Sequence, residues 1–276
     1  MPDIFPFNHR AMATYFEVRI ANESNTYAAQ AAQAAIDLLD KLESRLSRFR
    51  PTSDIAQIAQ LAPGEKLRVS EPTFACLEIA KKMQLATLGA FSANAAALQT
   101  QACMPQWHLS STEQSIHCVS GQLQFDLGAI GKGFALDRMA ELLRGWDCPA
   151  FLLVAGGSSI LAGKAPNETA GWSCGLGENN APQRFLLSHS SLSGSGLAVK
   201  GNHIFDPRTG LPAPRQNRAW ALADSAAESD ALSTASMVLT QPELEEVLAQ
   251  NESWLVFLEA GETIQTIGRR VQPPQV

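Results

Sequence analysis

The alternation of apolar and polar residues predicts a strand near the N-terminus, followed by a long amphipathic helix. In residues 15–21, Phe16, Val18 and Ile20 share one face, because successive side chains of a strand point to opposite sides. Residues 27–49 instead carry apolar residues at helical spacing, and these are Ile36, Leu39, Leu42, Leu46 and Phe49. Pro51 follows and is expected to end the helix.

The same patterns of apolar and polar residues predict the remaining helices and strands. The expected helices span residues 73–88, 134–146, 228–239 and 242–250. The expected strands span residues 123–127, 151–154 and 254–258, with short strands and turns over 172–192 and an irregular stretch over 92–121. Strands and helices interleave without a regular βαβ rhythm, which favours an α+β fold over a doubly wound sheet.

Length and composition limit the class of protein. A chain of 276 residues can bury a large core, and we expect one domain over residues 1–268 with a polar tail at 269–276. The net charge is −6 and the sequence has no basic run, which disfavours nucleic acid as a partner. Only 17% of residues are charged, below the usual level of about 25%.

Targeting and redox signals are few. The apolar stretches are too short to span a membrane, and the N-terminus lacks the basic start and apolar segment of a secretory signal. The chain is therefore expected in the cytoplasm, or in the periplasm if a signal segment has been removed. Its five cysteines are scattered and odd in number, which favours free thiols over a disulfide framework or zinc site.

A glycine-rich segment over residues 126–133 is the first candidate for chemistry. The expected strand leads into Gly128, Gly131, Lys132 and Gly133, and a helix follows. Free amides and a lysine at a helix N-terminus suit a phosphate or pyrophosphate. The spacing is neither that of a P-loop nor G-x-G-x-x-G. A plain strand-to-helix turn with an exposed lysine is the alternative, and it is favoured when the segment is taken alone.

A second candidate segment runs from His203 to Gly210. Its Asp206-Pro207-Arg208-Thr209-Gly210 portion is typical of a type I turn with a following left-handed glycine, so we expect a hairpin corner. His203 lies on the strand that leads into it. An imidazole there is either an ordinary strand residue or a general base.

Asp230 and Thr234 form the third candidate. Four residues apart on a helix, they face the same way and offer the hard oxygen ligands that Mg²⁺ prefers. Glu228 is a further candidate ligand but lies off that face. The alternative is that Asp230 caps or decorates the helix while Thr234 bonds back to its own turn. Residues 193–196 read as a flexible Ser-Gly turn whose amides can approach a ligand.

Six segments, in order, resemble the ApbE-type FAD:protein FMN transferase family. Each matches a motif of that family, and the matches run in the family's order across most of the chain. They are Met12-Ala13-Thr14-Tyr15-Phe16, Ser47-Arg48-Phe49-Arg50-Pro51-Thr52-Ser53-Asp54-Ile55, Gly89-Ala90-Phe91, the segments 126–133 and 203–210, and Asp230-Ala231-Leu232-Ser233-Thr234-Ala235.

The resemblance implies a fold and an activity. The fold would be a single ApbE-like α+β domain of two intimate lobes, with mixed sheets and flanking helices. The activity would be Mg²⁺-dependent cleavage of the FAD pyrophosphate. FMN would pass as a phosphoester to a Thr or Ser hydroxyl of an acceptor flavoprotein, and AMP would leave.

The resemblance also implies roles for particular residues. Asp230 and Thr234 would bind the metal through their side chains, and Gly131 through its carbonyl. Lys132 would lie near the phosphates, and His203 would take the proton of the acceptor hydroxyl. Asp206 would brace the hairpin or orient His203. The residues expected to bind FAD are Met12, Gly128, Lys132, Ser195, Gly196 and His203.

The chain also departs from the family pattern. After Gly89-Ala90-Phe91 the family's D-P-T-V is replaced by Ser92-Ala93-Asn94-Ala95, and its N-x-G-G-D turn reads Val154-Ala155-Gly156-Gly157-Ser158. Two other functions therefore stand beside the transferase. One is an FAD pyrophosphatase in which water replaces the acceptor, and the other is a non-catalytic FAD-binding paralogue.

Overall fold

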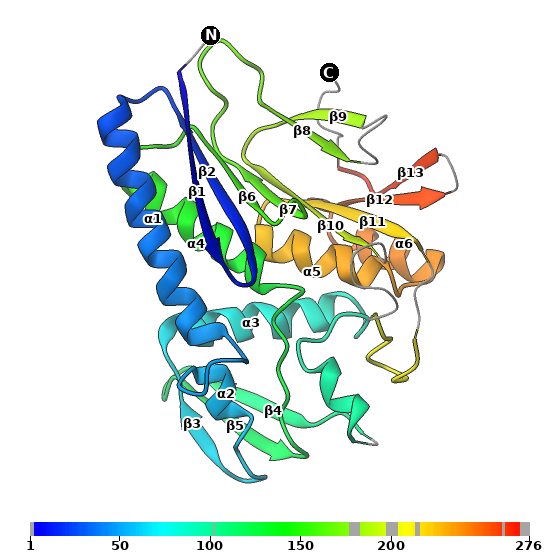
Figure 1. Ribbon diagram of the computed structural model, residues 1–276. Coiled ribbons are helices and arrows are strands. Elements are labelled where there is room, and N and C mark those ends of the chain that lie inside the picture. The colour runs from blue at the N-terminus through cyan, green and yellow to red at the C-terminus, as the bar shows by residue number, and fades with distance from the viewer. Residues whose placement is uncertain are drawn as a thin grey trace.

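The computed structural model describes residues 3–101, 103–176, 183–196, 204–212, 216–260 and 263–270. Its main feature is a large sheet of eight described strands in the order β1-β2-β6-β7-β10-β11-β12-β13 (Figure 1). Their bounds are β1 Ile4–Ala11, β2 Thr14–Ala21, β6 Phe151–Ala155, β7 Ser159–Ala162, β10 Ser190–Gly196, β11 Arg218–Ala223, β12 Leu255–Ala260 and β13 Thr263–Ile267. The α+β class is confirmed, and all described strand pairs are antiparallel where the expected sheets were mixed.

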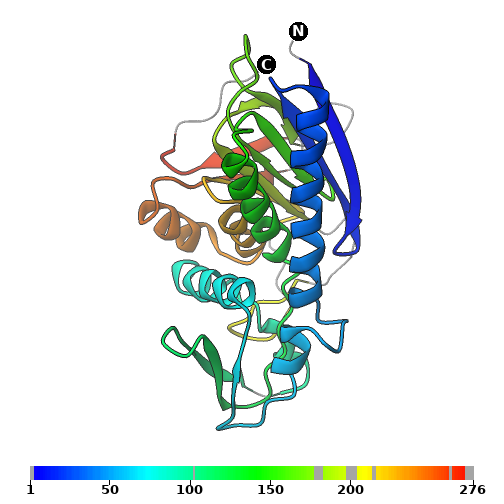
Figure 2. The ribbon, with the colours of Figure 1, turned by 90° about the vertical axis from the view of Figure 1, so that its left-hand side faces the viewer.

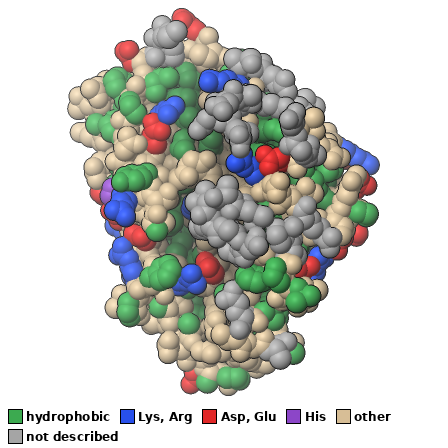
Figure 3. Space-filling view, turned by 45° about the vertical axis from the view of Figure 1, so that its right-hand side comes forward, with side chains coloured by type: hydrophobic (Ala, Val, Ile, Leu, Met, Phe, Trp, Pro, Cys, Tyr) green, Lys and Arg blue, Asp and Glu red, His purple; other side chains and the backbone are tan. Residues whose placement is uncertain are grey.

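Helices cover one face of the large sheet (Figure 2). They are α1 Asn25–Leu46, α4 Gly131–Gly145, α5 Ala226–Ser236 and α6 Gln241–Ala249. The opposite face is covered by the antiparallel strand pair β8 Trp172–Leu176 and β9 Gln183–Leu187, which forms a second, smaller core. The face shown in Figure 3 mixes apolar, basic and acidic side chains without a dominant charge.

A smaller lobe lies at one end of the molecule (Figure 1). It contains a second sheet, β3-β5-β4, with bounds β3 Lys66–Arg68, β5 Ser115–Ser120 and β4 Gln106–Ser110. Its helices are α2 Asp54–Ile58, α3 Glu71–Ala86 and the short 3-10 helix η1 Ala95–Gln99. Trp107 and Ile116 of this lobe belong to the same buried cluster as Phe16 and Phe134 of the large one, so the two lobes share one core.

The predicted amphipathic elements are confirmed, with shifted ends. Phe16, Val18 and Ile20 are all buried on one face of β2. Helix α1 ends at Leu46, because Ser47 has an extended backbone and caps it. Helix α4 begins at Gly131, three residues before the expected start, so Lys132 lies in the first turn of the helix. Across the described residues, no helix is both long and apolar enough to cross a membrane.

Two expectations about the middle of the chain were wrong. Residues 123–127 form no strand; the backbone N–H groups of Gln124 and Asp126 bond instead to the Asn94 side chain and the Ala93 carbonyl, each at 2.7 Å. Leu123, Phe125 and Leu127 of this segment are nevertheless buried alternately, as they would be in a strand. Residues 92–121 are not all irregular, since they contain η1, β4 and β5. The few apolar residues Trp107, Ile116 and Cys118 attach β4 and β5 to the core, because all three are buried in its main cluster.

Candidate functional site

The N-terminal turns of α4 and α5 lie in direct contact. A Cβ at Gly133 would be only 2.1 Å from the carbonyl oxygen of Ala226, so only glycine permits this approach. The Gly133 N–H donates to Oδ2 of Asp230 at 3.2 Å. The close packing therefore brings the Asp230 carboxylate of α5 to the positive end of the α4 dipole.

A carboxylate of α4 holds the beginning of α5. Asp137 accepts hydrogen bonds from the N–H groups of Ala226 and Ala227, at 2.7 and 2.8 Å, and from the Ser225 hydroxyl at 2.7 Å. Burial raises the pKa of Asp137, and these hydrogen bonds oppose the rise. Sequence reasoning missed this cap because its partners lie about ninety residues away along the chain.

The Asp230 carboxylate is the charged centre of the site. Its side chain is only 3% exposed, and Lys132 Nζ lies 3.2 Å from each of its oxygens. Ser159 Oγ donates to Oδ1 at 3.2 Å. Lys132 Nζ also donates to the carbonyl oxygen of Gly128 at 3.2 Å. The glycine segment and the Asp230 helix thus meet as expected, and Ser159 is a contact that the sequence did not suggest.

Thr234 lies beside Ser195 of the large sheet. Its hydroxyl donates to the carbonyl oxygen of Asp230 at 3.4 Å and shares a 3.0 Å hydrogen bond with the Ser195 hydroxyl. Ser195 and Gly196 belong to strand β10, so the expected flexible turn over residues 193–196 was wrong. A Cβ at Gly194 would be 2.7 Å from the Trp220 ring, so this glycine is needed for strand packing.

The Asp206–Gly210 segment forms the expected tight corner. Phe205 bridges Pro212 across it, and Gly210 has a φ of +71°. The Asp206 carboxylate accepts from the Arg208 N–H at 2.9 Å and from its guanidinium at 2.8 Å to each oxygen. This pairing raises the pKa of Arg208. Through these contacts Asp206 braces the corner.

For two other expected site residues, His203 and Met12, no contact with the Lys132–Asp230 pair is described. His203 lies outside the described residues. Met12 occupies the left-handed turn between β1 and β2, with a φ of +49°, and its N–H donates to Glu43 at 2.9 Å. No hydrogen bond or ion pair of the described residues joins Met12 to Lys132 or Asp230. Glu228 points elsewhere, bonding to Lys82 and to the Trp254 indole.

The donor atoms around Asp230 are of the kind that Mg²⁺ binds. The Asp230 carboxylate and the Thr234 hydroxyl, which bonds to the Asp230 carbonyl, are hard oxygens, and so is the carbonyl of Gly131, the first residue of the helix whose Gly133 N–H bonds to Asp230. The described residues contain no cluster of three or more His, Cys, Asp or Glu suited to a metal. A single carboxylate balances only part of the charge of a divalent cation, so a cation held by Asp230 would keep positive charge available to a phosphate. On this chemistry the residues fit a divalent cation.

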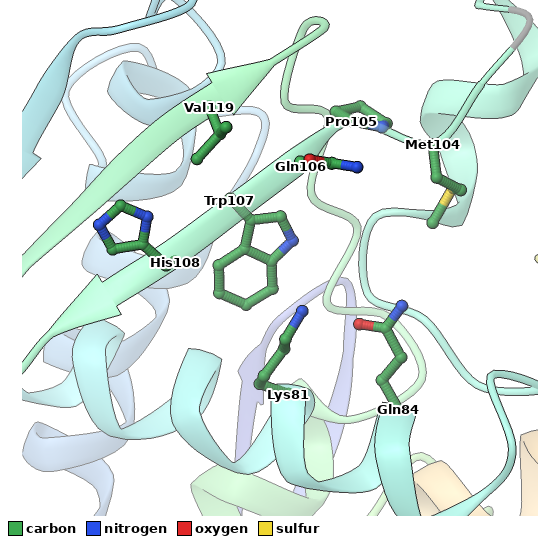
Figure 4. Close-up of a pocket in the computed structure, with 8 residues that line it drawn as sticks. All are labelled: Lys81, Gln84, Met104, Pro105, Gln106, Trp107, His108 and Val119. Carbon is green, nitrogen blue, oxygen red and sulfur yellow. The ribbon is translucent and has the colours of Figure 1, made fainter.

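A separate pocket lies between α3 and β4 in the small lobe (Figure 4). It has a volume of about 450 Å³, and none of the sequence-predicted site residues lines it. Lys81 points from α3 toward the Trp107 ring, with Nζ 4.9 Å from the ring centroid (Figure 4).

Several solved structures share this fold over nearly the whole chain. The flavin transferase ApbE from Vibrio cholerae aligns with a TM-score of 0.82 at 16% identity, covering 96% of this chain and 97% of that one. The apo flavinyl transferase ApbE from Pseudomonas stutzeri aligns with a TM-score of 0.81 at 18% identity, covering 96% and 94%.

Curated relatives match over shorter regions. A FAD:protein FMN transferase from Chlamydia muridarum is 28% identical over 149 residues, which cover 49% of this chain and 46% of that protein. One from Klebsiella pneumoniae is 27% identical over 117 residues, or 38% and 35%. The matched region thus spans less than half the length of these relatives. The family-level match is broader, extending over residues 12–258, and the chain therefore belongs to the ApbE family.

Proposed function

We propose that this protein is a Mg²⁺-dependent FAD:protein FMN transferase. It takes FAD, attaches FMN through a phosphoester bond to a Thr or Ser hydroxyl of an acceptor flavoprotein, and releases AMP. The observation that carries the proposal is the buried Asp230 carboxylate, which lies beside Lys132, Thr234 and the N-terminus of α4. Family membership over most of the chain supports it.

The chemistry of phosphoryl transfer suits this arrangement. The reaction needs positioning and neutralisation of charge more than covalent help from the protein. Asp230, Thr234 and the Gly131 carbonyl are the proposed cation ligands, and the cation, when bound, supplies charge neutralisation at the pyrophosphate. Met12, Gly128, Ser195 and Gly196 are the proposed remaining contacts to FAD.

The proposed transfer is a single displacement at phosphorus, in which one bond forms and one breaks. The acceptor hydroxyl oxygen forms a bond to the FMN phosphorus, and the bond from that phosphorus to the bridging oxygen breaks. AMP leaves with the electron pair of the broken bond. His203 is proposed to take the hydroxyl proton, since an imidazole titrates near neutral pH. Lys132 balances negative charge on the phosphates.

One assay distinguishes the candidate functions. The protein is incubated with FAD, Mg²⁺ and a candidate acceptor, and AMP and in-gel flavin fluorescence of the acceptor are followed. AMP with a fluorescent acceptor supports transfer. AMP without one indicates a pyrophosphatase, and bound FAD without AMP indicates a non-catalytic FAD-binding protein.

Asp230→Asn tests the metal assignment. The substitution keeps the shape of the side chain but removes its charge, so we expect AMP release to fall by about 100-fold or more. Asp224→Asn is the matched control, because Asp224 lies just before α5, is exposed and pairs with Arg270. AMP release by Asp230→Asn at the parent rate would exclude Asp230 as a ligand.

His203→Ala tests the base. We expect transfer to the acceptor to fall by about 100-fold or more, while FAD binding, followed by flavin fluorescence quenching, stays close to that of the parent. Acceptor labelling at the parent rate would leave His203 as a hairpin residue without a catalytic role.

A further inference from the structure

The Lys132 side chain turns inward onto a carboxylate. Its Nζ lies at 3.2 Å from both oxygens of Asp230 and at 3.2 Å from the Gly128 carbonyl, and the side chain is 19% exposed. All three contacts are with oxygen atoms. The ammonium is therefore held in a cage of oxygens much as a small cation would be.

Burial explains why the lysine adopts this position. An ionised carboxylate that is only 3% exposed needs a counter-charge close by. The other donors to Asp230 are the neutral Gly133 N–H and Ser159 hydroxyl. Among the described contacts of this carboxylate, Lys132 supplies the positive charge.

A divalent cation would change this balance. A cation bound to Asp230 would need the same carboxylate oxygens that the ammonium now contacts. Two positive charges held about 4 Å apart in a partly buried site repel each other strongly. The lysine and the cation therefore exclude each other from Asp230.

We propose that Lys132 is the counter-ion of Asp230 in the metal-free protein, and that cation binding displaces its ammonium toward the pyrophosphate. The inference rests on the proposed function, because it takes Asp230 as a cation ligand. Lys132 thus has two alternating partners, a carboxylate without metal and a phosphate with it. It lowers the affinity of the site for metal while keeping the metal-free protein stable.

Lys132→Met tests the competition. Methionine retains an unbranched side chain without the charge. We expect Mn²⁺, measured by titration with electron paramagnetic resonance, to bind the variant about tenfold more tightly. We also expect the melting temperature of the variant to rise more on Mn²⁺ addition than that of the parent. Lys66→Met, which removes an exposed lysine paired with Glu113 in the small lobe, is the control and should leave both values unchanged.

A second measurement uses the unmodified protein and does not depend on the variant folding. Acetylation by an amine-reactive reagent is followed at each lysine by peptide mass spectrometry. We expect Mg²⁺ to increase the modification of Lys132 several-fold, and FAD added after Mg²⁺ to reduce it again, with Lys66 unchanged throughout. Lys132 modification that does not respond to Mg²⁺, or Mn²⁺ affinity that is equal or weaker in Lys132→Met, would overturn the proposal.

The outcomes separate this inference from the proposed function. A parent protein that releases AMP from FAD, combined with an unchanged Mn²⁺ affinity in Lys132→Met, retains the function and refutes the displacement. A parent protein that releases no AMP, combined with tighter Mn²⁺ binding in Lys132→Met, refutes the function and retains the displacement.

Discussion

Gly133 sets the distance between α4 and α5 and thereby the position of Asp230. The missing side chain lets the first turn of α4 touch the backbone of α5, and the Gly133 N–H then reaches the Asp230 carboxylate. Gly133 thus sets the packing distance between the two helices and also donates a hydrogen bond to the Asp230 carboxylate. A glycine inside a helix is normally unfavourable by about 1 kcal/mol relative to alanine, so close packing is the reason for its presence.

Gly133→Ala should destabilise the protein by about 3 kcal/mol or more, because the new methyl group meets backbone atoms that cannot rotate away. Urea denaturation followed by circular dichroism measures the change. Gly145→Ala is the control, since no atom lies within 4 Å of its added Cβ at the other end of α4. It should be neutral or stabilising by up to about 1 kcal/mol. An equal loss of stability in both variants would mean that α4 and α5 can move apart at little cost in free energy.

Residues that act together on one element were predictable from the sequence, whereas partners from distant segments were not. Asp230 and Thr234 are four apart, so helical spacing alone placed them on one face. Ser159 donates to the same carboxylate from 71 residues away, and the sequence holds no local signal for that contact. The family resemblance implied that the segments of Lys132 and Asp230 belong to one site, but the ion pair between the two residues was not predicted.

At the scale of elements, helix α6 anchors the Asp206 corner. Arg208 donates to Glu243 of α6 at 2.6 Å and binds Asp206 on its other side. Glu243 also accepts from the Thr240 N–H at 2.8 Å, which completes a capping box at the start of α6. The corner and the helix are therefore fixed by the same carboxylate.

This carboxylate gives the protein a pH-dependent contribution to stability. The hydrogen bond from the Thr240 N–H, with further help from Arg208, lowers the pKa of Glu243. Because the folded pKa lies below the unfolded value of about 4.3, the stabilisation is present above that pH and is lost as the pH falls through the folded pKa. Glu243→Gln should thus cost about 1 kcal/mol at pH 7, and the difference from the parent should shrink at pH 3.

Thermal unfolding of both proteins at the two pH values measures this effect. Glu245→Gln is the matched control, because Glu245 lies on the exposed side of the same helix and contacts only Gln241 among the described hydrogen bonds. If the stability difference between Glu243→Gln and the parent stayed constant between pH 7 and pH 3, the charge of Glu243 would contribute nothing to stability.

Helices were predicted better than strands for a physical reason. The buried stripe of α1 is a local pattern, while a strand depends on a partner that the sequence does not identify. Residues 123–127 have the alternation of a strand, yet their N–H groups bond to Ala93 and Asn94. Strand β4 carries few apolar residues, and it forms because β5 pairs with it and Trp107 packs into the core.

At the scale of the whole molecule, the shared core makes the two lobes depend on each other. Trp107 of β4 packs edge-on against Phe125 with ring centroids 5.1 Å apart. Phe125 lies in the segment that runs directly into α4, which begins at Gly131. Trp107 and Phe125 belong to the same buried cluster as the helices of the large lobe. Among the described residues, the small lobe has no apolar cluster apart from this shared core, so it has little to keep it folded after the large lobe has opened.

We therefore expect the protein to unfold in one transition despite its size, since the usual reason for intermediates is independent domains. Trp107 reports on the small lobe, and its signal is the difference in fluorescence between the parent and Trp107→Phe. In a urea titration its midpoint should coincide with that of far-ultraviolet circular dichroism, which is dominated by the larger lobe. Loss of the Trp107 signal at a clearly lower urea concentration would mean that the small lobe unfolds first. The packing of Trp107 on Phe125 would then contribute little to the stability of the large lobe around α4.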